Sequence, residues 1–375
     1  MTARSRVLVA GLLIGSWSCP ASAGANPETL SVPAGFDIEI YADDVDGARQ
    51  MALGDTGIVY VGSRRPGKIH AVIDHNGDQR ADEIVEIASG LNLPSGLAYR
   101  EGDLYVAEVH RVLRFAGIDS NFRDKPEPEV VIDNLPDERS HGWKYLKFGP
   151  DGKLYLPVGM PCNICEAEDP RFGTILAFEP DGSEPEFVAR GVRNSVGFDF
   201  QPGTGALWFT DNGRDYLGDD RPPDELNRVD KRGAHFGFPY IHGGDIPDPE
   251  FGKGKDPKDY VAPVWRFGAH VAALGMTFYT GDMFPQTCRQ RILVAQHGSW
   301  NRSTKVGYRV MMLTVRDNEV IRAEPFVSGW LAKNEAVSGR PVDVMQMPDG
   351  SVLISDDQGD AIYRVSYRGE RDSEH

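Results

Sequence analysis

Three segments of the chain hold side chains suited to chemistry, and the first holds a candidate general base. Residues 139–152 read RSHGWKYLKFGPDG, and His141 comes just before a run that is typical of a strand. A histidine with a pKa near neutrality is the usual group for removing a proton from a hydroxyl. Taken alone, a loop histidine is more often a hydrogen-bonded structural residue. We therefore consider both roles for His141.

The second segment combines a cation with an amide. Residues 190–199 read RGVRNSVGFD, so Arg193 and Asn194 stand together before a glycine and an apolar strand. A planar guanidinium beside an amide suits a carboxylate or a quinone oxygen. The simpler alternative is an arginine that ties its loop to a nearby aspartate, and the residues alone favour that alternative.

The third segment is rich in oxygen ligands. Residues 219–229 read DDRPPDELNRV, and residues 233–240 read GAHFGFPY. Acidic side chains together with the backbone carbonyls of a Gly-x-Pro turn are oxygens of the kind that calcium prefers. An ordinary acidic loop followed by an aromatic turn explains the same residues equally well.

A separate acidic turn spans residues 74–83, which read DHNGDQRADE. Asp74, Asn76 and Asp78 place oxygens at alternate positions, as the start of an EF-hand loop does. The sixth position is Gln79 and the twelfth is Val85, so a complete EF-hand is not expected. A second, structural calcium ion and a solvated turn remain equal alternatives for this loop.

A recurring pattern indicates the scaffold that positions these segments. A turn containing Gly, Asp or Pro is followed by a short apolar strand and, after a gap, by a second strand. The leading strands lie in residues 55–61, 101–106, 150–156, 203–209, 291–295 and 348–354, and the trailing strands in 68–73, 112–115, 174–178, 308–313 and 361–365. β-branched and aromatic residues dominate these runs, and no window shows sustained helical periodicity.

Six such units predict an all-β fold, a six-bladed β-propeller with four-stranded antiparallel blades of roughly 59 residues each. The longest insertion is expected between Asn212 and Cys288. The strand at residues 36–41 is expected to pair into the last blade and close the ring, which removes exposed sheet edges. Function must then be carried by the loops around the central channel.

Composition narrows the possible partners. The formal net charge of −16 argues against nucleic acid and anionic membrane surfaces, and it suits calcium binding. An anionic cofactor would need a local cluster of Arg and Lys against this acidic background. The 42 Gly and 26 Pro fit many tight turns between short strands.

The start of the chain predicts export. Residues 1–23 combine Arg4 and Arg6 with an apolar run at residues 7–14 and a small-residue cleavage pattern ending at Ala23. A lipoprotein anchored at Cys19 is the less favoured alternative. We therefore expect a signal peptide over 1–23, a single propeller domain over 24–375, and a periplasmic or secreted location without membrane insertion.

The remaining cysteines predict a disulfide. Cys162 and Cys165 form a C-x-x-C pair with no following histidine, which excludes covalent haem attachment. In an oxidising compartment a small loop disulfide is preferred over a two-cysteine zinc half-site. Cys288 is expected to be a buried free thiol.

The order of the motifs resembles a known family. His141 before F-G-P-D-G, then G-V-R-N, then D-E-L-N and then H-F-G-F-P is similar to the pyrroloquinoline quinone (PQQ)-dependent sugar dehydrogenases. Within them the chain resembles the soluble glucose and aldose dehydrogenases, and most closely the sorbosone and pyranose dehydrogenase branch. The late segments AQHGSWNR at 295–302 and GRPVD at 339–343 also resemble that branch, and the resemblance runs from about residue 36 to residue 365.

The resemblance implies roles for named residues. His141 would be the general base, Arg193 would polarise the quinone carbonyl, and Asn194 would hold the cofactor. The backbone carbonyls of Gly237 and Pro239 would bind the calcium ion that contacts PQQ.

The same resemblance implies a cluster of cofactor-binding cations, with two departures from the family pattern. Arg340 would pair with a carboxylate of PQQ. Val342 stands where the soluble glucose enzymes have a second arginine, and a lysine that serves PQQ in those enzymes has no clear match. His297 or Arg302 would replace that lysine, and Arg64 or Arg302 would complete the cluster.

The function implied is a PQQ- and calcium-dependent oxidoreductase that oxidises an aldose or a sugar aldehyde of the sorbosone or pyranose type. Electrons would pass to an external acceptor, either a soluble carrier or a quinone, since the sequence has no haem motif. One alternative is a calcium-dependent lactonase or related hydrolase on a six-bladed propeller. A second alternative is a propeller that only binds a partner.

Overall fold

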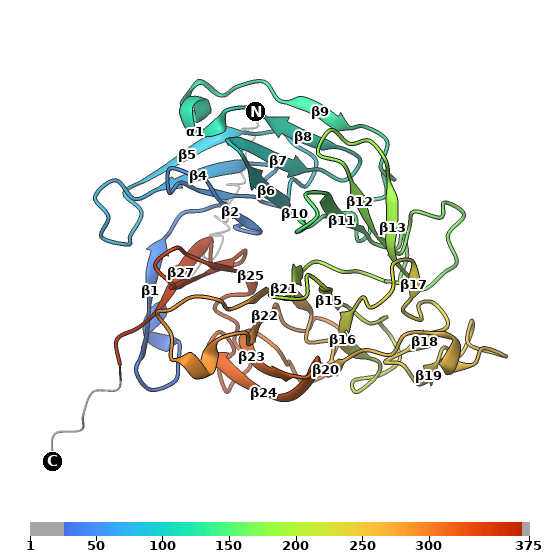
Figure 1. Cartoon of the computed structure of the whole chain (residues 1–375). Helices are drawn as coiled ribbons and strands as arrows, with labels where there is room; N and C mark the ends of the chain where they lie inside the picture. The colour runs from blue at the N-terminus through green and yellow to red at the C-terminus, as the bar shows by residue number, and fades with distance from the viewer. Residues whose placement is uncertain (1–25, 370–375) are drawn as a thin grey trace, which may run out of the picture.

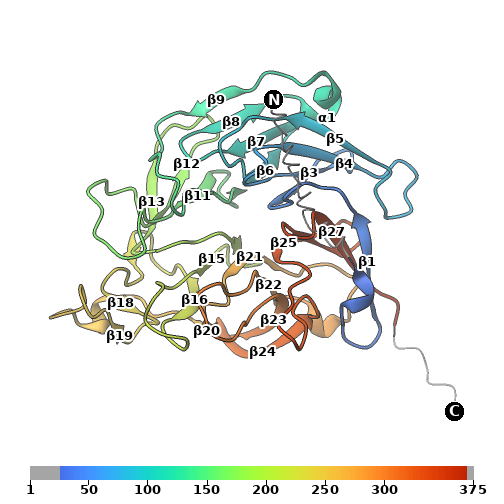
Figure 2. The same cartoon turned by 180° about the vertical axis from the view of Figure 1, so that it is seen from behind.

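The computed structural model describes residues 26–369, which form six small antiparallel sheets around a central axis (Figures 1 and 2). Five sheets have four strands, and the sheet of the third blade gains a fifth strand at its outer edge. The six-bladed β-propeller predicted from the repeat is confirmed. The predicted signal peptide over 1–23 lies outside the described residues.

The first two blades follow the chain in simple meanders. Their strands are β2 (Met51–Leu53), β3 (Val59–Val61), β4 (Ile69–Ile73) and β5 (Glu83–Ala88), then β6 (Gly96–Arg100), β7 (Asp103–Ala107), β8 (Val112–Phe115) and β9 (Glu129–Ile132). The short helix α1 (Ile118–Asn121) and the 3₁₀ turn η2 (Phe122–Asp124) lie between β8 and β9.

The third and fourth blades are linked by an inserted segment. Their strands are β10 (Lys147–Phe148), β11 (Leu154–Val158), β12 (Thr174–Phe178) and β13 (Glu186–Arg190), then β14 (Phe198–Phe200), β15 (Leu207–Asp211), β16 (Pro223–Arg228) and β20 (Trp265–Ala269). The insertion between β16 and β20 holds β17 (Ala234–His235), which pairs in parallel with β13, the hairpin of β18 (Ile241–His242) and β19 (Ile246–Pro247), and the 3₁₀ turn η3 (Pro257–Asp259).

The insertion is shorter than expected because the segment predicted as an acidic loop contains a strand. Residues 223–228 form β16, which pairs with β15 on one side and β20 on the other. Asp224, Glu225 and Asn227 are buried there. The two carboxyl groups accept backbone hydrogen bonds, Asp224 from the N–H of Gly213 and Glu225 from that of Gly243. Polar residues can therefore fill a central strand that their composition assigns to a loop.

The last two blades complete the ring. Their strands are β21 (Ala273–Phe278), β22 (Ile292–Gln296), β23 (Arg309–Arg316) and β24 (Glu319–Val327), then β25 (Pro341–Gln346), β26 (Val352–Asp356), β27 (Ala361–Tyr367) and β1 (Phe36–Ala42), with the 3₁₀ turns η1 (Pro27–Thr29) before β1 and η4 (Gln286–Cys288) between β21 and β22.

Closure comes from the N-terminal strand, as predicted. β1 pairs antiparallel with β27, with Ile38 opposite Val365, and Figure 1 shows the blue β1 beside the red β27. The first and last blades also share a core cluster in which Val59 and Val61 belong with Leu353 and Ile362. Burial of these apolar side chains between neighbouring blades stabilises the ring, at about 25 cal/mol per Å² of apolar surface removed from water.

The blade topology gathers one set of loops at one end of the channel. The innermost strand of the first blade begins at Met51, just after Arg49, and the second strand ends at Val61, just before Arg64. Because the two strands are antiparallel, the entry to the first and the exit from the second lie at the same end. The same antiparallel arrangement in every blade brings the segments around residues 141, 193, 212, 297 and 340 to that end.

The structure also tests the cysteine predictions. Cys162 and Cys165 form a disulfide, and Cys288 is a buried free thiol, so both expectations are confirmed. Within residues 26–369 no helix is long and apolar enough to cross a membrane.

Candidate active site

A pocket of about 480 Å³ opens at this end of the channel. Loops from blades all around the axis contribute to it, and five arginines are among its lining residues. The lining residues are Arg49, Arg64, Arg65, Ser140, His141, Trp143, Arg193, Asn194, Asn212, Gly213, Asp215, Asp224, His270, Ala272, Leu274, His297, Gly298, Trp300 and Arg340. This volume lies within the range of about 300–1,000 Å³ that is usual for small-molecule sites.

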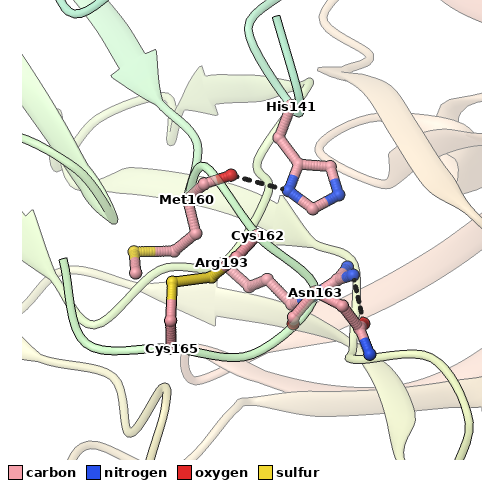
Figure 3. The surroundings of a disulfide bond; sticks show 6 residues. All are labelled: His141, Met160, Cys162, Asn163, Cys165 and Arg193. Atoms are coloured by element: carbon pink, nitrogen blue, oxygen red, sulfur yellow. Dashed lines mark hydrogen bonds between the residues drawn. A yellow bond between two sulfur atoms is a disulfide. The ribbon is translucent and has the colours of Figure 1, made fainter. Parts of the chain in front are cut away.

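His141 is held in a defined tautomer. Its Nδ1 atom lies 2.9 Å from the carbonyl oxygen of Met160, and because a carbonyl only accepts, Nδ1 must carry the proton (Figure 3). The Nε2 atom of the neutral ring is then free to accept a proton. Burial, and secondly the charge of Arg193, lowers the pKa of His141 to about 3, so the ring is neutral at physiological pH.

His141 also requires a glycine as its neighbour. Its backbone lies in the left-handed region with φ of 49°, which is unusual for a residue with a side chain. A Cβ atom on Gly159 would lie 2.7 Å from the Cβ of His141 and 2.6 Å from its carbonyl oxygen. Only glycine at position 159 leaves room for this placement of the histidine.

Arg193 is buried and almost fully hydrogen-bonded, with 3% of its surface exposed. Its Nε donates to the carbonyl of Asn163 at 2.9 Å, and Nη1 donates to the carbonyl of Asn212 at 3.2 Å. Nη2 donates to Oδ1 of Asn163 at 2.9 Å and to Oδ2 of Asp215 at 3.1 Å. Four of the five N–H groups of the guanidinium are used, and one N–H on Nη1 is left. Burial lowers the pKa of Arg193, and Asp215 opposes that shift.

Two buried polar atoms in the pocket wall have no protein partner among the described residues. They are the amide oxygen of Asn194 and the indole nitrogen of Trp143. The backbone N–H of Asn194 is held by Oδ1 of Asp211 at 2.6 Å, so the residue itself is firmly placed. A buried polar atom without a partner is costly, so each of these two atoms requires a bridging water or a polar ligand.

The arginines of the pocket exceed the carboxylates that neutralise them. Arg49 pairs with Asp357 at 2.7 Å and Arg193 pairs with Asp215. Arg64, Arg65 and Arg340 have no carboxylate within 4.0 Å among residues 26–369. Burial lowers the pKa of Arg64 to about 10, and the charges of Arg49, Arg65 and Arg340 act in the same direction. The pocket is therefore a local cationic site on an acidic protein.

His297 and Arg340 form one side of this cationic site. The Nε2 atom of His297 lies 2.7 Å from Oδ1 of Asp357, whose other oxygen binds Arg49. Arg340 donates from Nε to the carbonyl of His297 at 3.0 Å and from Nη2 to that of Gly298 at 2.5 Å. Burial lowers the pKa of His297 to about 4, so it contributes a neutral N–H to Asp357 at neutral pH.

The structure brings six of the twelve sequence-predicted residues together in the pocket and places the other six outside it. His141, Arg193, Asn194, Arg340, His297 and Arg64 all line the pocket. Arg302 does not, because its Nε binds the carbonyl of Thr304 at 2.9 Å and its Nη2 lies 3.2 Å from Asp220.

The two residues whose backbone carbonyls were predicted to bind calcium, Gly237 and Pro239, also lie outside the lining of this pocket. The carbonyl of Gly237 accepts the backbone N–H groups of Tyr240 and Ile241 at 2.8 and 3.0 Å, and Pro239 lines a different, smaller cavity beside Cys165.

The loop of Asp74, Asn76 and Asp78 lies on the outside of the first blade, between β4 and β5. Asp74 accepts the backbone N–H groups of Gly77 and Gln79, and Asp78 accepts that of Arg80. These side chains therefore stabilise the turn itself. Within residues 26–369 no group of three or more His, Cys, Asp or Glu side chains is arranged to hold a metal ion.

Several residues of the pocket were missed from the sequence. Arg49 and Arg65 have a local signal, because each stands within a few residues of a strand end that faces the channel opening. Asn163, Asp215 and Trp300 have no comparable signal. Asp215 and Trp300 line the pocket and Asn163 contacts Arg193 behind its wall, all through loop conformations that the sequence pattern does not specify.

The fold and the site define a six-bladed propeller with a cationic, histidine-containing pocket at one end of its channel. Residues 107–364 match the family model described as glucose/sorbosone dehydrogenase. The chain belongs to this family, and it is therefore a sugar dehydrogenase of the oxidoreductase class. An uncharacterised protein of Borreliella burgdorferi is 34% identical over 355 residues, which cover 90% of this chain and 91% of that protein.

Two solved structures share the fold. The calcium structure of a Trichoderma reesei carbohydrate-active enzyme of family AA12 has a TM-score of 0.77 and 18% identity, covering 90% of this chain and 97% of that chain. The holo form of the pyranose dehydrogenase PQQ domain from Coprinopsis cinerea has a TM-score of 0.77 and 16% identity, covering 93% of this chain and 99% of that chain. At these identities the likeness is one of fold.

Proposed function

We propose that the chain is a PQQ-dependent sugar dehydrogenase that requires calcium and oxidises an aldose or a sugar aldehyde of the sorbosone or pyranose type. The observation that carries the proposal is the convergence of uncompensated arginines on one pocket beside a neutral histidine. The pyranose dehydrogenase domain with the same fold was solved as a PQQ domain in its holo form, which supports the choice of cofactor.

The pocket fits a cofactor with several carboxylates. PQQ carries three carboxylates, and Arg64, Arg65 and Arg340 are three guanidiniums without a carboxylate partner in the described part of the chain. Guanidinium–carboxylate pairs are strong and can be bidentate. The unpartnered amide oxygen of Asn194 and indole N–H of Trp143 would complete the contacts.

The residues around the reacting centre have distinct tasks. When bound, the quinone supplies a carbonyl centre that accepts a hydride. His141 would take the proton of the sugar hydroxyl on Nε2, because its Nδ1–H is held by Met160. Arg193 would direct its remaining N–H at developing negative charge, since its other N–H groups are fixed by protein acceptors.

Calcium and the electron acceptor belong to the same proposal. The calcium structure of the Trichoderma reesei enzyme supports the metal requirement. Cys162 and Cys165 are joined to each other and therefore cannot attach a haem. Electrons would then leave to a separate soluble carrier or quinone. The disulfide and the leader-like residues 1–23 support a periplasmic or secreted location. Membership in a dehydrogenase family favours this function over lactone hydrolysis and over partner binding alone.

The test is a titration of purified protein with PQQ, with and without calcium. Binding is followed by absorbance, and activity by dye reduction on a panel of aldoses and sugar aldehydes. We expect saturable, calcium-dependent binding and bleaching of the cofactor when one of the sugars is added. If PQQ does not bind with calcium present, the proposal is wrong, and lactone hydrolysis would be assayed next.

A further inference from the structure

One short segment of the chain contacts both His141 and Arg193 (Figure 3). It begins at Met160, whose carbonyl binds Nδ1 of His141 at 2.9 Å and whose N–H donates to the carbonyl of Arg193 at 2.8 Å. Two residues further on, the disulfide between Cys162 and Cys165 closes a loop of four residues. The general base and the guanidinium are thus supported by the same stretch of chain.

Asn163, inside this loop, makes the contacts that orient the guanidinium. Its carbonyl and its Oδ1 each accept from Arg193 at 2.9 Å. Its Oδ1 also accepts the N–H of Asp215 at 2.8 Å, and its Nδ2 donates to the carbonyl of Asp215 at 3.2 Å. Asp215 in turn binds Nη2 of Arg193. Two of the four hydrogen bonds of the Arg193 side chain therefore come from Asn163, and a third comes from a residue that Asn163 holds.

Regular secondary structure does not fix this loop. Between β11 and β12, the backbone of residues 161–168 makes no backbone–backbone hydrogen bond within the described chain. The restraints that remain include the disulfide, the side chain of Asn163, and a hydrogen bond of 2.6 Å from the Tyr240 hydroxyl to Oε1 of Glu166. A covalent closure of so short a loop limits the conformations open to Asn163.

We propose that Asn163 is a positioning residue for Arg193, and that the Cys162–Cys165 disulfide keeps Asn163 in place so that turnover depends on the intact disulfide. The inference rests on the proposed function, because it assigns Arg193 to the reacting centre. Without the loop, the buried guanidinium loses two fixed acceptors and can take other orientations. The loss of an oriented Arg193 destabilises the transition state more than it weakens sugar binding. We therefore expect a larger change in kcat than in KM.

The mutational test uses Asn163→Ala and the double variant Cys162→Ser/Cys165→Ser. We expect kcat to fall by about tenfold to 100-fold in each, because misplacing a reacting group by about 1 Å has effects of this size. Asn121→Ala, which removes a single side-chain bond from helix α1 on the outer side of the second blade, should keep the wild-type rate. Circular dichroism and thermal melting establish that each variant is folded.

The pH profile separates positioning from a general structural defect. Arg193 is the charged side chain that acts on the pKa of His141, although Arg49, Arg64, Arg65, Arg340, Asp215 and Asp224 line the same pocket. If Arg193 moves away, the pKa of His141 rises and the histidine stays protonated to higher pH. The acid limb of kcat/KM should then move to higher pH in Asn163→Ala.

Reduction of the wild-type disulfide provides a test without mutation. A phosphine reductant cleaves the disulfide with one water molecule: the phosphine gives up two electrons and takes the water oxygen to become its oxide, and the two water protons convert the two sulfurs to thiols. The treatment should lower kcat of the wild-type enzyme and leave the double serine variant unchanged. If the double serine variant does not fold, the reduction experiment still tests whether turnover depends on the disulfide.

Full turnover in Asn163→Ala and after reduction, in an enzyme that oxidises sugar with PQQ, would overturn the inference alone. An inactive wild-type enzyme that does not bind PQQ would instead overturn the proposed function.

Discussion

The guanidinium carbon of Arg64 lies 4.5 Å from the centre of the Trp143 ring, so the cation is stacked on the indole in the pocket wall. Stacking of this kind fixes the plane of a guanidinium and leaves its N–H edge available. Arg64 has no carboxylate partner in the described chain, and its pKa is lowered to about 10. A cation held in this way, among other arginines, is prepared for an anionic ligand.

Replacement of Arg64 or Arg340 by alanine should weaken PQQ binding. Each charged hydrogen bond contributes about 1.5–3 kcal/mol, so the dissociation constant should rise by about tenfold to 100-fold. Titration by absorbance measures the change.

The thermal stability of the protein without cofactor should change little in Arg64→Ala, because the substitution removes repulsion from Arg49, Arg65 and Arg340 together with the attraction of Asp357 and the stacking on Trp143. Arg123→Ala, which breaks a surface pair with Glu83, is the matched control and should bind PQQ normally. Unchanged affinity in both pocket variants would remove these arginines from the cofactor site.

His141→Ala should cut turnover by about 10²–10⁴-fold while PQQ binding is retained. The variant removes the group whose Nε2 is left unprotonated by the bond to Met160. Steady-state kinetics and PQQ titration measure the two effects separately. A loss of PQQ binding comparable to the loss of rate would show that His141 holds the cofactor instead.

The pH dependence of the wild-type enzyme should reflect the buried state of this histidine. Burial and Arg193 lower the pKa of His141 to about 3, so the ring stays deprotonated below its ordinary pKa of 6.5. The acid limb of kcat/KM should therefore lie well below pH 6.5. If the kcat/KM profile has an acid limb near pH 6.5 that persists in His141→Ala, the titrating group is a residue other than His141.

Gly159→Ala should lower activity without unfolding the propeller. The new Cβ would lie 2.6 Å from the carbonyl oxygen of His141, so the histidine loop must shift. Because the base must stay within hydrogen-bond reach of its proton, kcat should fall by about tenfold or more. Gly268→Ala is the control, since its Cβ would meet only the side chain of Val271 at 3.4 Å. Equal activity in the two variants would contradict the tight placement of His141.

The sequence predicted the scaffold well because its signals are local. Alternating strands and turns identified all six blades, and the strand at residues 36–41 was correctly assigned to closure. The failure at β16 has a physical cause, since Asp224, Glu225 and Asn227 are buried by hydrogen bonding rather than by apolar packing. A pattern of apolar residues cannot detect such a strand.

The candidate site was predictable where a residue stands at the end of a strand. His141, Arg193 and Arg340 precede innermost strands, so the topology alone carries them to the channel opening. Asn163 could not be found in this way, because its position depends on a loop without regular hydrogen bonding. The calcium-binding role of the Gly237 carbonyl stays a prediction, and only the turn geometry shows that this carbonyl accepts two backbone N–H groups.

The buried carboxyl of Glu225 should make the protein less stable as the pH rises. Burial raises the pKa of Glu225 to about 8, and the nearby Asp211 acts in the same direction. In the unfolded chain the same group titrates near 4.5. Between these two pH values the folded state binds the extra proton and the unfolded state does not, so the contribution of Glu225 to stability falls from pH 4.5 to pH 8.

Glu225→Gln should remove this contribution while preserving the size and polarity of the side chain. The amide can still accept the backbone N–H of Gly243, which now lies 2.6 Å from Oε1. The stability difference between variant and wild type should therefore shift in favour of the variant as the pH increases from 5 to 8, by a few kcal/mol at most. Urea unfolding at both pH values measures it, with Glu184→Gln on the surface as the control. A pH-independent difference would show that Glu225 is ionised in the folded protein and that neighbouring donors stabilise its charge.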